Sequence, residues 1–118
     1  MIEQWLPIIG YEGIYEVSDL GRVRRIGQAQ GSTPGMIIKP QGRPYYQVNL
    51  SRNHKGQSYK IHTLVMQAFF GPRPKGMEVN HKNTIKLDNR AENLEYVTPL
   101  ENTRHAISNR LWNHRGSH

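Results

Sequence analysis

One histidine and three asparagines in the second half of the chain have types and a spacing that could support chemistry. They are His81, Asn80 directly before it, and then Asn93 and Asn102. A neutral imidazole can accept a proton from water, and an amide oxygen can orient that imidazole or bind a hard metal ion. As a set, these groups are the parts needed to hydrolyse a phosphodiester bond, whereas each residue alone is more simply read as structural.

The chain is strongly basic and has no cysteine. Its 118 residues carry 16 Lys and Arg against 9 Asp and Glu, a formal net charge of +7. Such a surface attracts polyanions, so nucleic acid is the expected partner. Without thiolates, an oxygen-rich site suits Mg²⁺ or Mn²⁺ better than zinc. We find no signal peptide and no apolar run that could span a bilayer, so we expect a cytoplasmic protein without membrane contact.

The first part of the chain, residues 1–50, is predicted to form a small mixed β module. Alternation of apolar and polar residues predicts its strands, which are expected at residues 14–17, 21–26, 36–39 and 46–50. Residues 18–21 are predicted to form the turn between the first two strands, and residues 27–35 a flexible loop. The whole chain is therefore assigned to the α+β class.

The second part, residues 51–114, is predicted to carry the candidate site. A strand at 58–61 is followed by a helix over 62–70, whose first residue, His62, is expected to make a local hydrogen bond. A strand then ends at His81, a polar loop runs from 82 to about 92, and a second strand covers 94–97. Asn89 and Arg90 are expected to organise that loop.

A second helix is predicted to begin after Thr98. Thr98 can cap it, Pro99 suits its first turn, and Glu101 completes a capping box. The apolar spacing on this helix predicts an inward face of Leu100, Thr103, Ile107 and Leu111. Residues 115–118 resemble the start of an expression tag and are left out of the interpretation.

Several of these segments resemble an HNH endonuclease of the group found in phages and mobile introns. The resemblance is carried by His62 and Ala68-Phe69, by residues 79–82, by residues 88–98 and by Glu101-Asn102. Residues 3–23 resemble the NUMOD4-like module that often precedes such a nuclease, through Glu3-Gln4-Trp5, residues 9–18 and Gly21-Arg22-Val23. Together these matches cover most of the chain.

The resemblance implies a ββα-metal, or His-Me finger, nuclease core around one divalent cation, Mg²⁺ or Mn²⁺. It implies that His81 is the general base, that Asn93 steadies this histidine, and that Asn102 and Asn80 bind the metal. Relatives commonly have Asp at the position of Asn80 or an Asp-Gly turn after the histidine, whereas this chain has Asn83-Thr84-Ile85 in that turn. The predicted metal site therefore lacks a carboxylate at this position.

The expected function is metal-dependent hydrolysis of double-stranded DNA to 5′-phosphate and 3′-hydroxyl ends. Candidate DNA-binding residues are Arg22, Arg24, Lys82, Lys86, Arg90 and Arg104. Because few residues follow Asn102, we expect low sequence specificity, and we expect a monomer or weak dimer acting in a bacterial or phage-infected cell. Two alternatives stay open: a catalytically degenerate DNA-binding module with the same fold, and an RNA-binding or ribonuclease domain.

Overall fold

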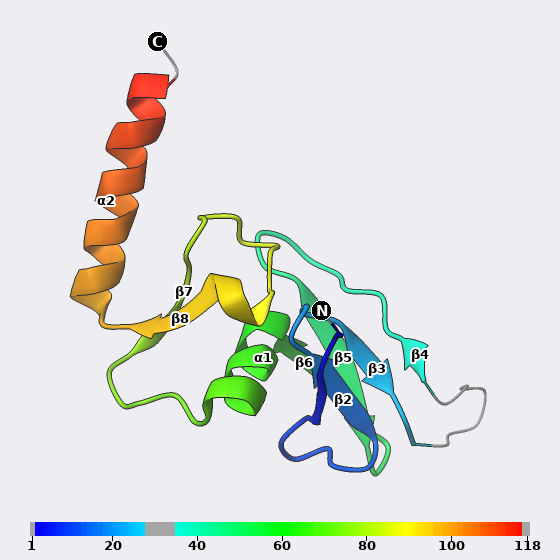
Figure 1. Ribbon diagram of the computed structural model, residues 1–118. Helices are drawn as coiled ribbons and strands as arrows, with labels where there is room; N and C mark the ends of the chain where they lie inside the picture. The colour runs from blue at the N-terminus through cyan, green and yellow to red at the C-terminus, as the bar shows by residue number, and fades with distance from the viewer. Residues whose placement is uncertain (1, 28–34, 117–118) are drawn as a thin grey trace.

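The computed structural model describes residues 2–27 and 35–116, with side chains of the last helix described as far as residue 108. The described residues form a four-stranded antiparallel sheet, two two-stranded hairpins and two α-helices. In Figure 1 the second of these helices projects away from the rest of the protein. Most of the predicted loop at 27–35 lies outside the described residues. The last two residues of the segment 115–118 also lie outside them. Mixed strands and helices confirm the α+β class.

The first sheet has the order β1-β2-β3-β4, and every neighbouring pair is antiparallel. Its strands are β1 Trp5–Pro7, β2 Tyr15–Ser18, β3 Val23–Arg25 and β4 Met36–Ile37. In β2, the buried Tyr15 and Val17 alternate with the half-buried Glu16, as expected for a strand with one face on the core. The predicted turn at residues 18–21 joins β2 to β3.

The first hairpin consists of β5 Gln47–Arg52 and β6 Lys55–Lys60, paired in register from Gln47↔Lys60 to Arg52↔Lys55. Two residues, Asn53 and His54, make its turn with φ of 53° and 63°. Positive φ at both central positions is the geometry that matches the right-handed twist of a hairpin. The last residue of β6 leads directly into the helix α1 Ile61–Phe70, which ends at Gly71 with φ of 91°.

The second hairpin consists of β7 Glu78–His81 and β8 Leu94–Val97, and the short 3₁₀ helix η1 Ala91–Asn93 precedes β8. The helix α2 Pro99–Gly116 follows immediately. The amide of Glu101 donates to Thr98 Oγ1 at 3.2 Å, which confirms Thr98 as the cap of this helix. The predicted order of strand, loop, strand and helix is therefore present in the last third of the chain.

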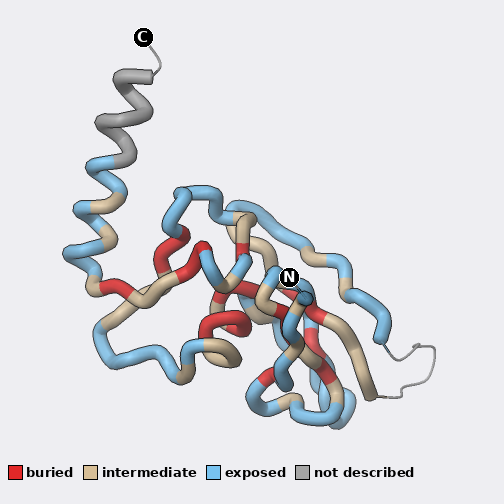
Figure 2. Tube along the Cα trace, in the orientation of Figure 1, coloured by how far each residue is buried: buried red, intermediate tan, exposed pale blue. Residues whose placement is uncertain are grey.

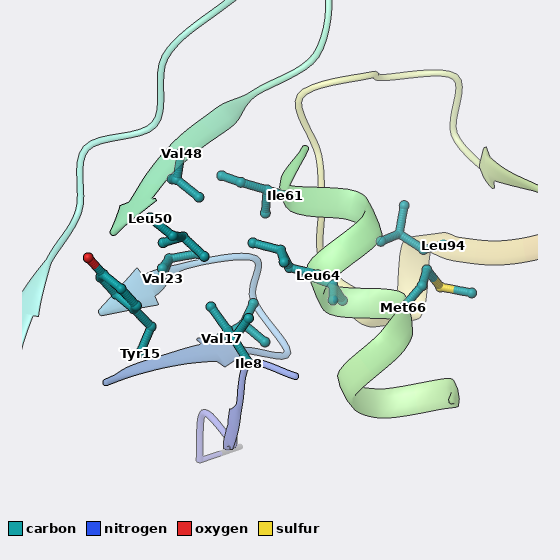
Figure 3. Packing of buried hydrophobic residues seen from close by; sticks show 11 residues of the cluster. Ile8, Tyr15, Val17, Val23, Val48, Leu50, Ile61, Leu64, Met66 and Leu94 are labelled. Carbon is teal, nitrogen blue, oxygen red and sulfur yellow. The ribbon is translucent and has the colours of Figure 1, made fainter. Parts of the chain in front are cut away.

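One hydrophobic core joins both parts of the chain. Figure 3 shows Val17 and Val23 of the first sheet beside Leu50 of β5, and these residues face Leu64 of α1 and, further on, Leu94 of β8. Burying each such side chain contributes roughly 1.5–3 kcal/mol to folding. The predicted boundary between residues 50 and 51 falls inside β5, so the two predicted units share this core and the hairpin that spans the boundary.

The predicted inward face of α2 is wrong where the structure describes it. Leu100 is 59% and Ile107 50% exposed, and Thr103 is also exposed, whereas Leu111 lies outside the described side chains. Figure 2 shows that exposure continues along the described part of α2, because the helix meets the rest of the protein only near its start. Its apolar spacing indicated a face but no packing partner. In the described ranges, no helix has the length and apolar character needed to cross a membrane.

Candidate active site

The β7–β8 hairpin places the candidate residues on two faces. Asn80 lies opposite Glu95 and His81 lies opposite Leu94. Because successive side chains of a strand point to opposite faces, Asn80 and His81 are presented in different directions. Leu94 is 2% exposed and belongs to the core cluster with α1, so it anchors the hairpin at the residue paired with His81.

His81 is held by a side chain that the sequence did not assign to it. The imidazole is 6% exposed, and its Nε2 lies 2.9 Å from Oδ1 of the buried Asn89. An amide oxygen only accepts hydrogen bonds, so Nε2 carries the hydrogen in this pair and the lone pair of the neutral ring is at Nδ1. Tyr45 and His62 flank the ring, with ring centroids 5.9 Å and 5.2 Å from that of His81.

Asn93 closes the loop between the two strands. Its Oδ1 accepts from the Asn83 amide at 3.0 Å, its Nδ2 donates to the Asp88 carbonyl at 2.9 Å, and its own carbonyl accepts from the Lys82 amide at 2.8 Å. None of these three bonds is made to the His81 side chain, so they can affect the imidazole only by fixing the backbone of the loop that follows it. A direct role of Asn93 at the imidazole stays a prediction, and the side chain bonded to the ring is that of Asn89.

The turn that differs from the family pattern is formed despite its composition. Asn83 Oδ1 accepts from the Ile85 amide at 2.9 Å, and the Thr84 amide donates to the His81 carbonyl at 2.9 Å. Thr84 has φ of 63°, a conformation that is unfavourable for a β-branched residue. The turn therefore follows His81 directly and keeps its hydrogen bonds at the cost of a strained residue.

The far side of the same loop is organised by Arg90, as predicted. Arg90 pairs with Asp88 at 2.8 Å and with Glu92 at 2.5 Å. The hydrogen bonds from Arg90, assisted by one from Asn83, lower the pKa of Asp88 to about 2. Asp88 is therefore ionised at neutral pH, and much of the charge of Arg90 is compensated locally.

Two carboxylates orient the predicted metal-binding amides. Asn80 Nδ2 donates to Glu95 Oε2 at 2.9 Å, and Asn102 Nδ2 donates to Glu78 Oε1 at 2.5 Å. A carboxylate only accepts hydrogen bonds, so the amide nitrogen must face it, and the amide oxygen points elsewhere. In the part of the chain that the structure describes, the side-chain hydrogen bonds of Asn80 and Asn102 are these two bonds of their nitrogens. Both oxygens therefore remain available to a cation.

Neither Glu78 nor Glu95 was among the residues predicted for the site. They bring two negative charges next to the amides, where relatives commonly have a carboxylate at the position of Asn80. Across the described residues, no group of three or more His, Cys, Asp and Glu side chains could hold a metal ion. The polar groups around Asn80 and Asn102 are instead amide and carboxylate oxygens, which are the ligands that hard divalent cations prefer. The cross-strand pair Asn80↔Glu95 could have been found by aligning the two predicted strands.

A basic cleft lies beside His81, between α1, the β7–β8 hairpin and the start of α2. It has a volume of about 470 Å³, and its lining includes Tyr45, Lys60, His62, Arg73, Glu78 and Asn102. Tyr45 and His62 are also the rings that contact His81, so the imidazole packs against two residues that line this cleft. The ammonium groups of Lys60 and Lys86 lie 5.1 Å and 5.5 Å from the centroid of the Tyr45 ring. Tyr45, Lys60 and Arg73 were not predicted.

The expected local hydrogen bond of His62 is not present at its buried ring nitrogen. His62 Nδ1 is buried without a partner, and the ring packs edge-on against Tyr45 with centroids 5.1 Å apart. Burial first of all, and then the charges of His81 and Lys60, lower the pKa of His62 to about 4. His62 is therefore neutral at working pH and forms an uncharged wall beside His81.

The six candidate DNA-binding residues fall into two groups. Three of them have carboxylate partners: Arg22 pairs with Glu3, Arg24 with Glu16 at 2.6 Å, and Arg90 with Asp88 and Glu92. The guanidinium groups of Arg22 and Arg24 also lie over Trp5. Lys82 and Lys86 in the loop and Arg104 on α2 are exposed, and within the described ranges no ion pair involves them. Of the six candidates, the positive charges without an ion-pair partner are therefore those nearest to His81 and Asn102 in the sequence.

Comparison with known proteins identifies two family segments. The sequence pattern of the HNH endonuclease family matches residues 59–104, and the NUMOD4 motif matches residues 3–51. The chain therefore contains an HNH endonuclease segment preceded by a NUMOD4 motif. The HNH match includes β7, β8 and the start of α2, and therefore all four predicted catalytic and metal-binding residues.

Relatives with the same two-part arrangement come from viruses and phages. An HNH endonuclease of Acanthamoeba polyphaga mimivirus, itself uncharacterized, is 40% identical over 109 residues, which are 90% of this chain and 26% of that protein. The DNA endonuclease I-HmuI of Bacillus phage SP01 is 34% identical over 105 residues, 89% of this chain and 58% of that protein. The chain thus spans from about a quarter to three-fifths of the length of these relatives.

The fold also matches a solved structure. The HNH homing endonuclease I-HmuI, in a structure that describes its DNA binding and cleavage, superimposes with a TM-score of 0.77 and 31% identity. The match covers 90% of this HNH endonuclease chain and 59% of the other. The predicted resemblance to a NUMOD4-like module and to an HNH endonuclease core is therefore confirmed.

Proposed function

We propose that this chain is the metal-dependent nuclease part of a DNA endonuclease, cutting phosphodiester bonds to leave 5′-phosphate and 3′-hydroxyl ends. The observation that carries the proposal is the arrangement at the β7–β8 hairpin. The His81 ring is oriented by Asn89 and packs against Tyr45 and His62, which line a basic cleft together with Asn102, and the amide nitrogens of Asn80 and Asn102 are both turned toward carboxylates. The similarity to I-HmuI supports DNA as the substrate.

His81 is proposed to take a proton from the attacking water through Nδ1. The hydrogen bond of Nε2 with Asn89 leaves the lone pair of the ring at Nδ1. Packing against Tyr45 and the neutral His62 restricts rotation of the ring. A general base must be held in both position and tautomer, and these three neighbours supply that restraint.

Asn80 and Asn102 are proposed to hold one divalent cation, Mg²⁺ or Mn²⁺, with Glu78 and Glu95 contributing negative charge beside them. The fit rests on the orientation of the two amides, because both nitrogens are occupied by carboxylates. When bound, such an ion stabilises charge on the scissile phosphate and on the leaving 3′ oxygen. Asn93 is proposed to act indirectly, by closing the loop that follows His81.

The direct test is cleavage of supercoiled plasmid DNA by the purified chain. We expect conversion to nicked or linear plasmid in Mg²⁺ or Mn²⁺ and none in excess EDTA, because the proposed reaction needs a divalent cation near Asn102 to stabilise charge on the scissile phosphate. Ligation without prior end repair checks the predicted 5′-phosphate and 3′-hydroxyl ends. Intact plasmid with retained DNA binding would favour a degenerate module. Preferential cleavage of RNA in a competition assay would favour a ribonuclease.

Lysine side chains around the cleft are proposed to hold the DNA backbone. Lys60 and Lys86 approach the same ring, that of Tyr45, beside His81. Arg22, Arg24 and Arg90 are more nearly compensated by their carboxylate partners, so their share of phosphate binding should be smaller. We further propose that the chain acts as a monomer or weak dimer in the cytoplasm of a bacterial or phage-infected cell, with low sequence specificity of the described part.

Binding should depend steeply on salt, because phosphate contacts release counterions. We expect Lys60→Ala to weaken binding of unrelated duplexes about equally and to reduce the slope of log affinity against log salt by about 1. Lys55→Ala is the matched control, because it removes the same charge from the opposite end of the same strand, β6. Equal effects of the two substitutions, or affinity nearly independent of salt, would contradict a phosphate-binding role for the cleft.

A further inference from the structure

The turn between β2 and β3, residues 18–21, is tightly held inside the NUMOD4 motif. Ser18 is fully buried, and its Oγ accepts from the amides of Leu20 at 3.2 Å and Arg22 at 3.1 Å. The Gly21 amide donates to the Ser18 carbonyl at 3.0 Å, and Gly21 has φ of 82°. Each of these bonds fixes backbone in the turn, so we name residues 18–21 the 18–21 turn and treat it as one rigid element.

This turn touches the loop that precedes β8. The Ala91 amide donates to the Asp19 carbonyl at 2.7 Å. At Gly21 the approach is closer still, because a Cβ built there would lie 2.8 Å from the Asn89 carbonyl oxygen and 2.9 Å from the Asn89 Cβ. Real Cβ atoms do not approach other heavy atoms so closely. Glycine is therefore required at position 21 both by its φ and by the space that Asn89 occupies.

Asn89 is also the residue that bonds the imidazole. Its backbone lies against Gly21, its Oδ1 lies 2.9 Å from His81 Nε2, and the residue is 4% exposed. A buried side chain of this kind has little freedom to move independently of its backbone. The chain of contacts from Gly21 through Asn89 to His81 thus connects the NUMOD4 motif to the proposed general base.

We propose that the 18–21 turn is a positioning element of the nuclease site: it sets the place of Asn89, and Asn89 sets the orientation and tautomer of His81. Gly21 and Asn89 are positioning residues, because they act through His81. The inference rests on the proposed function of His81 as the base. It assigns the NUMOD4 motif a part in catalysis beyond any contact with DNA, and it accounts for the shared core of the two family segments.

The first test compares Gly21→Ala with Gly13→Ala. Gly13 also has φ of 82°, but nothing lies within 4 Å of a Cβ added there. Both variants carry the same left-handed backbone penalty, and only Gly21→Ala pushes against Asn89. In single-turnover cleavage of bound plasmid we expect Gly21→Ala to be slower than Gly13→Ala by about tenfold or more, because small displacements of a catalytic group have large effects on rate.

The second test reads His81 without any cleavage. In mildly alkaline buffer, the ring ¹⁵N shifts of His81 should report a hydrogen on Nε2 in the wild-type protein. Asn89→Asp keeps an acceptor oxygen and should keep this tautomer. Asn89→Leu has a similar shape without an acceptor and should give a mixture of tautomers. Gly21→Ala should shift the same signals, whereas Gly13→Ala should leave them unchanged.

The outcomes separate this inference from the proposed function. A wild-type protein that fails to cut DNA but shows the expected pattern of His81 signals would refute the nuclease proposal and leave the positioning inference standing. Identical His81 signals and equal cleavage in Gly21→Ala and Gly13→Ala would overturn the inference. If Gly21→Ala does not fold, the pair Asn89→Asp and Asn89→Leu decides it: an unchanged tautomer in Asn89→Leu rejects the role of Asn89.

Discussion

Replacing His81 by alanine should lower DNA cleavage by at least about a hundredfold, the usual scale for losing a general base. His81 ends β7, and its imidazole is the ring bonded to Asn89. DNA binding should persist, because the exposed lysines around the cleft are unchanged. The measurement is single-turnover cleavage of plasmid at saturating protein, together with an independent binding curve and a thermal unfolding curve for each protein.

The matched control for this substitution is His54→Asn. His54 is exposed in the β5–β6 turn with φ of 63°, and asparagine tolerates that conformation. We expect this variant to cut DNA like the wild type. Cleavage by His81→Ala at the wild-type rate would remove His81 from the mechanism. A loss of cleavage that is matched by a loss of folding would point to packing against Tyr45 and His62 instead.

Replacing Asn80 by aspartate should make the protein more dependent on metal and bind that metal more tightly. Asn80 Nδ2 now donates to Glu95 Oε2 at 2.9 Å. An aspartate there would place two carboxylates in contact, which is unfavourable without a cation between or beside them. In EDTA we expect a lower unfolding temperature than for the wild type, and in Mg²⁺ or Mn²⁺ a larger gain. The metal concentration for half-maximal cleavage should fall by about tenfold, since ligand charge strongly tunes cation affinity.

Two further variants control this metal experiment. Asn102→Ala removes one of the two amide oxygens and should need much more metal or fail to cut. Asn49→Asp makes the same chemical change as Asn80→Asp on an exposed position of β5, where its partner is the hydroxyl of Ser58. It should show no change in metal dependence. If Asn80→Asp responds to metal no more than Asn49→Asp, Asn80 is not a ligand.

The contacts of Glu78 and Glu95 bear on the departure of this chain from the family pattern. An asparagine before the histidine brings no charge of its own, which by itself predicts weak metal binding. The hairpin places Glu95 directly opposite Asn80 and brings Glu78 to Asn102. Negative charge is therefore close to both amides. It is supplied by Glu95 and Glu78, whereas in relatives with Asp it is supplied at the position of Asn80 itself. The variants above measure how well that arrangement substitutes for a direct carboxylate ligand.

Much of the site could be predicted because its residues lie close together in the sequence. His81, Asn93 and Asn102 belong to one strand, loop, strand and helix unit, whose elements are encoded by short-range signals. Thr98 and Pro99 start α2 through local hydrogen bonds and a restricted φ. The order of elements was therefore predictable from residue types and spacing, whereas the family was indicated by the resemblance of several segments to known nucleases.

The contacts that orient those residues were not predictable in the same way. Asn89 was expected to bond within its own loop, but its side chain bonds His81, and that bond depends on how the loop folds back over the strand. Tyr45 and Lys60 reach the site from before α1, a part of the chain without any motif that pointed to them. Such contacts depend on the packing of whole elements, and sequence spacing does not report that packing.

The sequence by itself determined which groups this protein has for chemistry: a histidine, amides at a fixed spacing, excess positive charge and no thiolates. Local propensities also determined most strands and both helix starts, because those depend on residues within a turn or two. Only the tertiary structure decided that α2 leaves its apolar residues exposed and that Gly21 packs against Asn89. Periodicity can indicate a face, but a partner for that face is chosen by the close packing of the entire core.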